Sequence, residues 1–260
     1  MTDFCIETTA IHDEYIDEYN RRFAKLRKAL PNTQFICVTT NPSRVKSHPN
    51  LKVIDIKTYT NTNFVKSYDH IGGFCEILQA TRFGLREARL AGYLKVVHLQ
   101  TDITFTDEVN EENVSNHFIH GLYWDMGGTT LDKKIKNNDN KAVYLYEKYI
   151  GNSEDAKVIP VGDDPVAMFK FNSSEEFETY LYHLDNLCAE TYSHPGFTTG
   201  IADELAFAMH LTGVKSYYNY NEKSHCSRKK YFDVNHGHLH IKHYDDRDPT
   251  MLDMREFAAE

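Results

Sequence analysis

The first hundred residues alternate short apolar runs with segments whose apolar positions recur at helical spacing. Runs rich in β-branched and aromatic residues predict strands at 4–6, 34–39 and 51–56. The pattern between the first two strands predicts a helix over 11–30 that ends before Pro31. Its apolar residues lie three or four positions apart, at Ile16, Tyr19, Phe23, Leu26 and Leu30.

A second helix and a fully apolar strand follow. The helical pattern runs from about residue 74 to 91 and meets Gly92, a residue typical of a helix carboxyl end. Residues 94–99 (LKVVHL) are typical of a parallel strand covered on both faces. Four strands with interposed helices predict an α/β fold, with a doubly wound, mostly parallel central sheet and helices on both faces.

The second half of the chain is less regular. Residues 125–141 are polar and rich in Gly and Asn, which predicts a long loop or flap. A strand is predicted at 166–171, and helices at 174–189 and 201–211. Because neither an internal repeat nor a linker is evident, we expect one domain over residues 1–260.

Composition and charge argue against several classes of protein. Its 29 Lys and Arg residues against 38 Asp and Glu give a net charge of -9, which argues against binding a polyanion over the whole surface. No apolar run approaches the roughly 18 residues that a membrane span needs. The acidic start lacks the features of a secretory signal, so we expect a cytoplasmic protein. The 5 cysteines are scattered, which favours reduced, apolar roles over disulfides or zinc.

The segment at 96–105 (VVHLQTDITF) carries the first candidate chemistry. In open α/β sheets ligands bind beyond the carboxyl ends of the strands, which is where Gln100 and Asp102 are expected. Two oxygen-bearing side chains at this spacing suit a hard cation such as Mg2+ or Mn2+, which also takes phosphate oxygens. The alternative is an aspartate that caps the turn after the strand.

The stretch HLQTDITF resembles the metal-binding Asp-x-Asp segment of nucleotide-sugar-dependent glycosyltransferases of the GT-A fold, in which an apolar strand runs into the motif. Gln100 stands in place of the first aspartate. The resemblance implies a GT-A-like fold, a UDP-sugar donor and an Mn2+ or Mg2+ cofactor. It also leaves Asp102 as the one anionic ligand of the motif.

The segment at 236–242 (HGHLHIK) resembles the carboxyl-terminal segment of the glycogenin-like family. There a histidine six residues before a lysine completes the metal site, and the lysine meets the diphosphate. The resemblance assigns these roles to His236 and Lys242. The alternative is a half-buried strand whose histidines, His238 and His240, share one face.

An acidic pair, Asp203 and Glu204, opens the helix predicted at 201–211. It resembles the Asp-Glu segment of the retaining family that includes the blood-group transferases, in which the glutamate lies close to the reacting sugar carbon. The resemblance implies catalytic roles for both residues beside the sugar. The alternative is that acids in a first helical turn simply complement the helix dipole.

Basic and aromatic residues interleave over 215–232. Arg228, Lys229 and Lys230 are candidates for gripping a donor diphosphate, or a nucleic-acid backbone with tyrosines as stacking surfaces. The alternative is a solvated loop.

The nucleotide pocket is expected at the end of the first strand. Thr8 and Thr9 lie there in the sequence, where a GT-A fold receives the base and ribose. Asp69, in the segment before the second helix, is a further candidate for this pocket.

These resemblances predict a glycosyltransferase that moves a sugar from a UDP-sugar to a hydroxyl acceptor with retention of configuration. Residues 1–105 form the nucleotide-binding half and 106–260 the half that completes the metal and acceptor sites, with the flap at 125–141 excluding water. Two acceptors are considered: hydroxymethylated bases of bacteriophage DNA and a bacterial surface glycan.

Two other classes remain open. A non-catalytic nucleotide- or glycan-binding module that kept the fold is favoured by Gln100. A metal hydrolase is suggested by the histidines near the carboxyl terminus. The chain lacks the glycine-rich motifs of dinucleotide-binding and P-loop proteins and the nucleophile elbow of α/β-hydrolases.

Overall fold

The structure of the chain is a computed structural model. It describes residues 2–11, 13–58, 74–99, 101, 103–105, 109–112, 114–115, 135, 137, 139–149, 151–152, 166–193 and 241–243.

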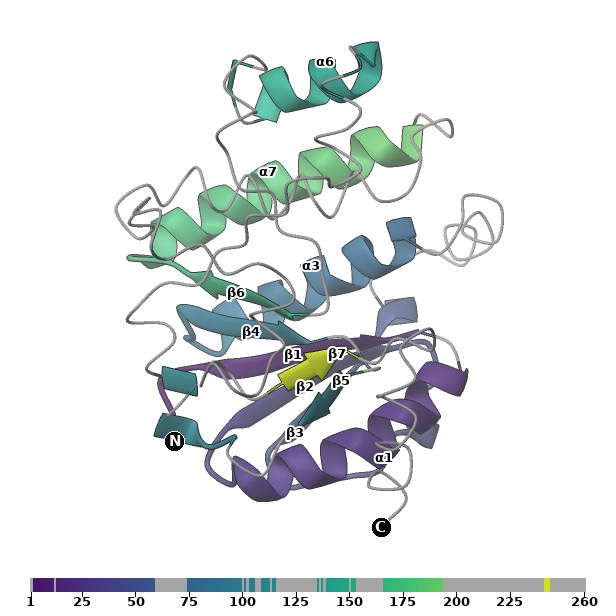
Figure 1. Cartoon of the computed structure of the whole chain (residues 1–260), viewed down its shortest axis with the longest axis vertical. Helices are drawn as coiled ribbons and strands as arrows, with labels where there is room; N and C mark the ends of the chain where they lie inside the picture. The colour runs from purple at the N-terminus through teal and green to yellow at the C-terminus, as the bar shows by residue number, and fades with distance from the viewer. Residues whose placement is uncertain are drawn as a thin grey trace.

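One mostly parallel sheet organises these residues (Figure 1). The strand order is β3-β2-β1-β4-β6, in which β1, β2, β3 and β4 are parallel and β6 is antiparallel to β4. The strands are β1 (Cys5–Ala10), β2 (Gln34–Thr39), β3 (Leu51–Asp55), β4 (Lys95–Leu99) and β6 (Val166–Lys170).

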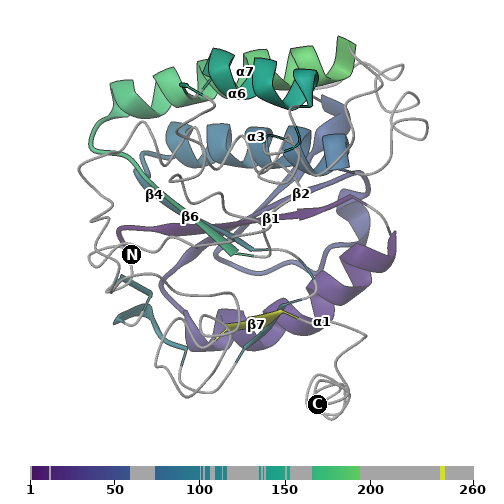
Figure 2. The same ribbon diagram turned by 45° about the horizontal axis from the view of Figure 1, so that its top comes forward.

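Helices cover both faces of the sheet. Figure 2 shows α1 (Asp13–Ala29) on one face and α3 (Phe74–Leu90) on the other, with α7 (Ser174–Ser193) outside α3 and α6 (Asn140–Tyr149) beside α7. Short 3-10 turns occur at Pro42–Arg44 and Ile56–Thr58.

The buried face of α1 follows the apolar spacing of the sequence. Ile16, Tyr19 and Phe23 are fully buried, and Leu26 is 1% exposed. This face packs against the sheet, with the Phe23 ring 6.5 Å from that of Phe35 in β2. The predicted helix is therefore confirmed, because its apolar stripe is the side that the sheet covers.

Helix α3 ends as the sequence predicts. Gly92 has a φ of 89°, which a residue without a side chain adopts at little cost. Its N–H donates to the Arg89 carbonyl at 3.0 Å, and the Tyr93 N–H donates to the Ala88 carbonyl at 3.0 Å. These two bonds satisfy carbonyls that the helix end leaves open and turn the chain into β4.

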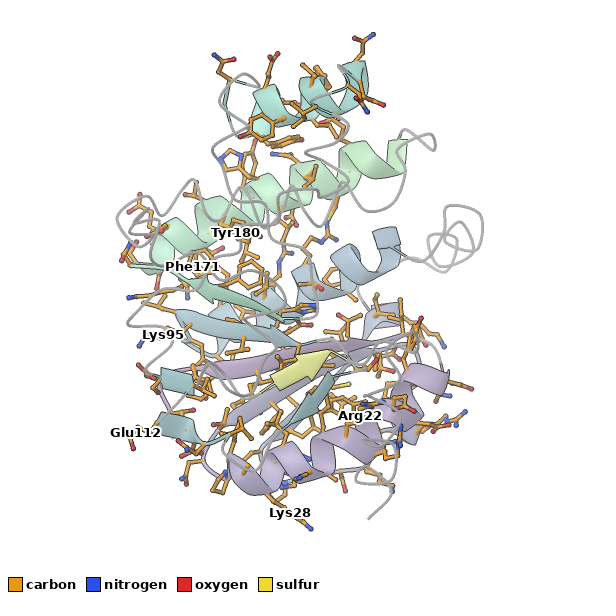
Figure 3. The ribbon with its side chains drawn as sticks, in the orientation of Figure 1. Arg22, Lys28, Lys95, Glu112, Phe171 and Tyr180 are labelled. Atoms are coloured by element: carbon orange, nitrogen blue, oxygen red, sulfur yellow. The ribbon has the colours of Figure 1, made fainter. Side chains whose placement is uncertain are left out.

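Helix α7 is fixed to α3 and to the end of β6. Arg82 and Arg86 of α3 both pair with Asp185, at 3.2 and 2.6 Å. Phe171, just after β6, packs its ring 5.4 Å from that of Tyr180 (Figure 3). Helix α7 therefore contacts both helix α3 and the end of the edge strand β6.

The ends of β1 and α7 and the start of α6 differ from the sequence-based expectation by several residues, with α7 running on to Ser193 instead of 189. Strand β1 runs on to Ala10, beyond the predicted residue 6, because the polar residues Glu7, Thr8 and Thr9 are buried within it and hide the apolar pattern. Helix α6 begins inside the predicted flap at 125–141, where the Asp139 carboxylate accepts the Ala142 N–H at 3.1 Å as a helix cap. Most of the predicted flap and the helix predicted at 201–211 lie outside the described residues.

Among the helices that the structure describes, none is long and apolar enough to cross a membrane.

Candidate functional site

The strand order reverses between β1 and β4. The chain proceeds from β1 to β2 and β3 on one side and then returns to β4 on the other side of β1. Open α/β sheets bind ligands at such a switch point, outside the carboxyl ends of the two strands. The candidate site is therefore the edge where β1 and β4 end, beside Thr9, Ala10, Leu99 and Thr101, all of which are buried.

A second, two-stranded sheet begins at this edge. Strand β5 (Ile103–Phe105) leaves the end of β4 and pairs antiparallel with β7 (Ile241–His243). The register sets Thr104 opposite Lys242. Figure 2 places β7 beside α1, on the face away from α3. Two segments that the sequence analysis singled out, far apart in the chain, thus lie on adjacent strands.

Thr8 and Thr9 lie on opposite faces of the main sheet. Side chains alternate along a strand, and Thr9 faces Thr81 of α3, so Thr8 faces the side that carries α1. Thr8 is 1% exposed, and its Oγ1 has no hydrogen-bond partner among the described residues. Of the two threonines, only Thr8 shares a face with the β5–β7 sheet.

The backbone of Lys242 is described, as part of β7. The other predicted site residues lie outside the described residues: Asp69, Gln100, Asp102, Asp203, Glu204, Arg228, Lys229, Lys230 and His236. Within the described part of the chain, no group of three or more His, Cys, Asp or Glu side chains could hold a metal ion. The predicted cation ligands remain a prediction from the sequence.

A buried acid–histidine pair lies at the switch point and was not among the predicted site residues. Glu7 is fully buried and His98 is 7% exposed. The two residues are partners in the β1–β4 register, and Glu7 Oε2 lies 2.5 Å from His98 Nδ1. An acid inside the apolar run of β1 and a histidine inside that of β4 were the sequence signals for this pair.

The pair is connected to helix α3. Thr9 Oγ1 donates to Glu7 Oε1 at 3.2 Å and lies 3.5 Å from Thr81 Oγ1. A Cβ added at Gly84 would lie 2.3 Å from Glu7 Cγ, closer than real Cβ atoms come. The absence of a side chain at Gly84 therefore lets α3 pack directly over the Glu7 carboxyl group.

The cysteines beside this pair are not candidate nucleophiles. Burial, with the negative charge of Glu7 adding to it, raises the pKa of the Cys5 thiol well above its usual range and raises that of Cys37 in the same direction. Both thiols stay protonated at neutral pH, and the thiolate is the reactive form. They act as small apolar residues, in agreement with the sequence analysis.

In comparisons with known proteins, no family model and no curated protein matches this chain.

Proposed function

We propose that the chain is a nucleotide-sugar-dependent glycosyltransferase that moves a sugar from a UDP-sugar to a hydroxyl acceptor. The observation that carries the proposal is the pairing of β5 with β7 where β4 ends. That pairing sets Lys242 opposite Thr104, two residues beyond Asp102 in the sequence. The two segments with the clearest motif resemblance are thereby neighbours at the edge where this class of sheet binds ligands.

In this proposal some residues around the diphosphate bind the cation and others stabilise negative charge. Asp102, with Gln100 and His236, provides oxygen and nitrogen donors suited to Mn2+ or Mg2+. A bound cation neutralises charge on the diphosphate. The Lys242 ammonium stabilises the negative charge that develops on the departing UDP, with Arg228 and Lys229 as further cations.

Other residues contact the nucleoside and the sugar of the donor in this proposal. The buried Thr8 hydroxyl, which has no partner among the described residues, is available to hydrogen bond to the nucleoside. Asp203 and Glu204 face the sugar in this proposal, and transfer proceeds with retention.

The acceptor is a hydroxyl group of either a hydroxymethylated DNA base or a surface glycan. The net charge of -9 requires that a DNA acceptor be held by a local basic segment. Residues 215–232, with their interleaved basic and aromatic side chains, suit that role.

A thermal-shift panel of UDP-, GDP- and CDP-sugars, with and without Mn2+, tests the proposal. A ligand at about one hundred times its dissociation constant adds roughly 2.7 kcal/mol of stability. For a domain of this size this raises Tm by about 5 °C or more. We expect the rise with UDP-sugars and Mn2+ together. A rise that ignores Mn2+ would instead favour the non-catalytic binding module, and a flat panel would contradict the proposal.

A further inference from the structure

The Glu7–His98 pair is costly to bury, which makes its presence in the core informative. The two residues lie on neighbouring central strands, β1 and β4, with Glu7 fully buried and His98 7% exposed. A buried polar pair is often no more stabilising than apolar residues of similar volume, since the cost of removing both groups from water offsets the bond between them. Stability alone therefore does not account for an acid and a histidine at these positions.

The hydrogen bonds of this pair have defined directions, unlike the contacts between apolar side chains. Glu7 bonds to His98 of β4 through one carboxylate oxygen and to Thr9 of its own strand through the other. Thr9 in turn lies 3.5 Å from Thr81 of α3, measured between the two hydroxyl oxygens. Hydrogen bonds with defined angles fix how β1, β4 and α3 sit against one another, which non-directional apolar contacts do less strictly.

The position of the pair connects it to the candidate site. His98 is the last residue but one of β4, and β5 begins only a few residues later at Ile103. Glu7 directly precedes Thr8 on β1. The bond between the two strands therefore lies one residue before the end of β4 and three residues before the end of β1, the two strand ends where the donor is expected.

We propose that Glu7 and His98 are positioning residues that set where the chain leaves β4 and so place the segment at 99–105 for donor binding. This inference rests on the proposed function. Glu7 and His98 act through the backbone that follows them and do not themselves touch the donor.

Two variants and a matched control test the inference. Glu7→Gln keeps the shape of the side chain and removes its charge. The double variant Glu7→Met with His98→Leu replaces the pair by apolar groups and serves if the single variant folds poorly. The control is Glu87→Gln in helix α3, the helix that packs over Glu7, where the buried Glu87 pairs with Lys52 of strand β3 at 2.5 Å.

Hydrogen exchange measured by mass spectrometry provides a readout that needs no ligand. In both test variants we expect amides at 99–105 to exchange about tenfold faster than in the unchanged chain, while amides of β2 and β3 keep their rates. The control substitution should leave the exchange rates of amides 99–105 unaltered. Unchanged exchange at 99–105, or an equal acceleration throughout the chain, would overturn the positioning role.

Titration with UDP and Mn2+ separates this inference from the proposed function. Loss of a supporting partner behind a metal site commonly costs 10- to 100-fold in affinity, so we expect at least a tenfold loss in the test variants and none in the control. If the unchanged chain binds and the test variants bind equally well, the inference fails and the proposed function stands. If the unchanged chain does not bind, the proposed function fails, and hydrogen exchange alone decides whether the pair positions the segment.

Discussion

An Asp102→Ala chain is expected to release UDP from its matched UDP-sugar, in the presence of Mn2+, roughly 100-fold or more slowly than the unchanged chain. Gln100 is neutral, so Asp102 supplies the only negative charge of the motif. Hard divalent cations depend on carboxylate oxygens, and removing one such stabilising group from a reacting centre commonly costs two to three orders of magnitude in rate. The measurement is the initial rate of UDP release at saturating donor.

The control for this substitution is Glu112→Ala, which removes an exposed carboxylate (labelled in Figure 3). We expect its rate and its Tm to match those of the unchanged chain. Asp102→Ala should likewise retain its Tm in the absence of ligand. An Asp102→Ala rate within about threefold of the unchanged rate would show that Asp102 does not hold the cation, since a lost metal ligand costs far more.

The second large effect is on stability. Gly84→Ala is expected to lower the free energy of unfolding by roughly 1–3 kcal/mol, because the added Cβ overpacks the core against Glu7. A decrease in the free energy of unfolding is informative because Gly→Ala within a helix otherwise stabilises by about 1 kcal/mol. Denaturant unfolding followed by circular dichroism gives the difference. For a domain of this size, Tm should fall by roughly 2–4 °C per kcal/mol.

A double variant shows whether Glu7 is the cause. Combining Gly84→Ala with Glu7→Ala removes the side chain that the new Cβ would meet. The double variant should therefore lose less stability than the sum of the losses in the two single variants. Leu90→Ala, at the exposed end of the same helix, should change stability by no more than about 0.5 kcal/mol. A Gly84→Ala chain more stable than the unchanged chain would place Glu7 elsewhere.

Much of the sheet could be predicted from local pattern. Strand β2 spans the predicted residues 34–39, and α3 begins at the predicted residue 74 and ends at Leu90, two residues before the predicted capping residue Gly92. These elements carry their signals within a few residues, as apolar runs or as a capping glycine. The end of β1 could not be predicted in this way, because its polar residues are buried by partners on other elements.

The candidate site depends more on tertiary structure. The proposal requires that the segments near residues 102, 204 and 236 meet at one site. Of these segments the structure describes only the pairing of 103–105 with 241–243, so the meeting of the site residues stays a prediction. The contact between Glu7 and His98 requires the register of two strands far apart in the sequence, which no local pattern encodes. Nothing in the letters around Gly84 indicates that it faces a carboxyl group rather than ending a helix.

The most direct test of the account is the hydrogen-exchange footprint of UDP with Mn2+ on the unchanged chain. A donor bound at the proposed site should slow exchange in three separate segments, 7–11, 99–105 and 236–243, with no change in β3 or α7. Protection confined to one of these segments, or located on the outer helices, would contradict a donor site shared by the ends of β1 and β4 and the β5–β7 sheet.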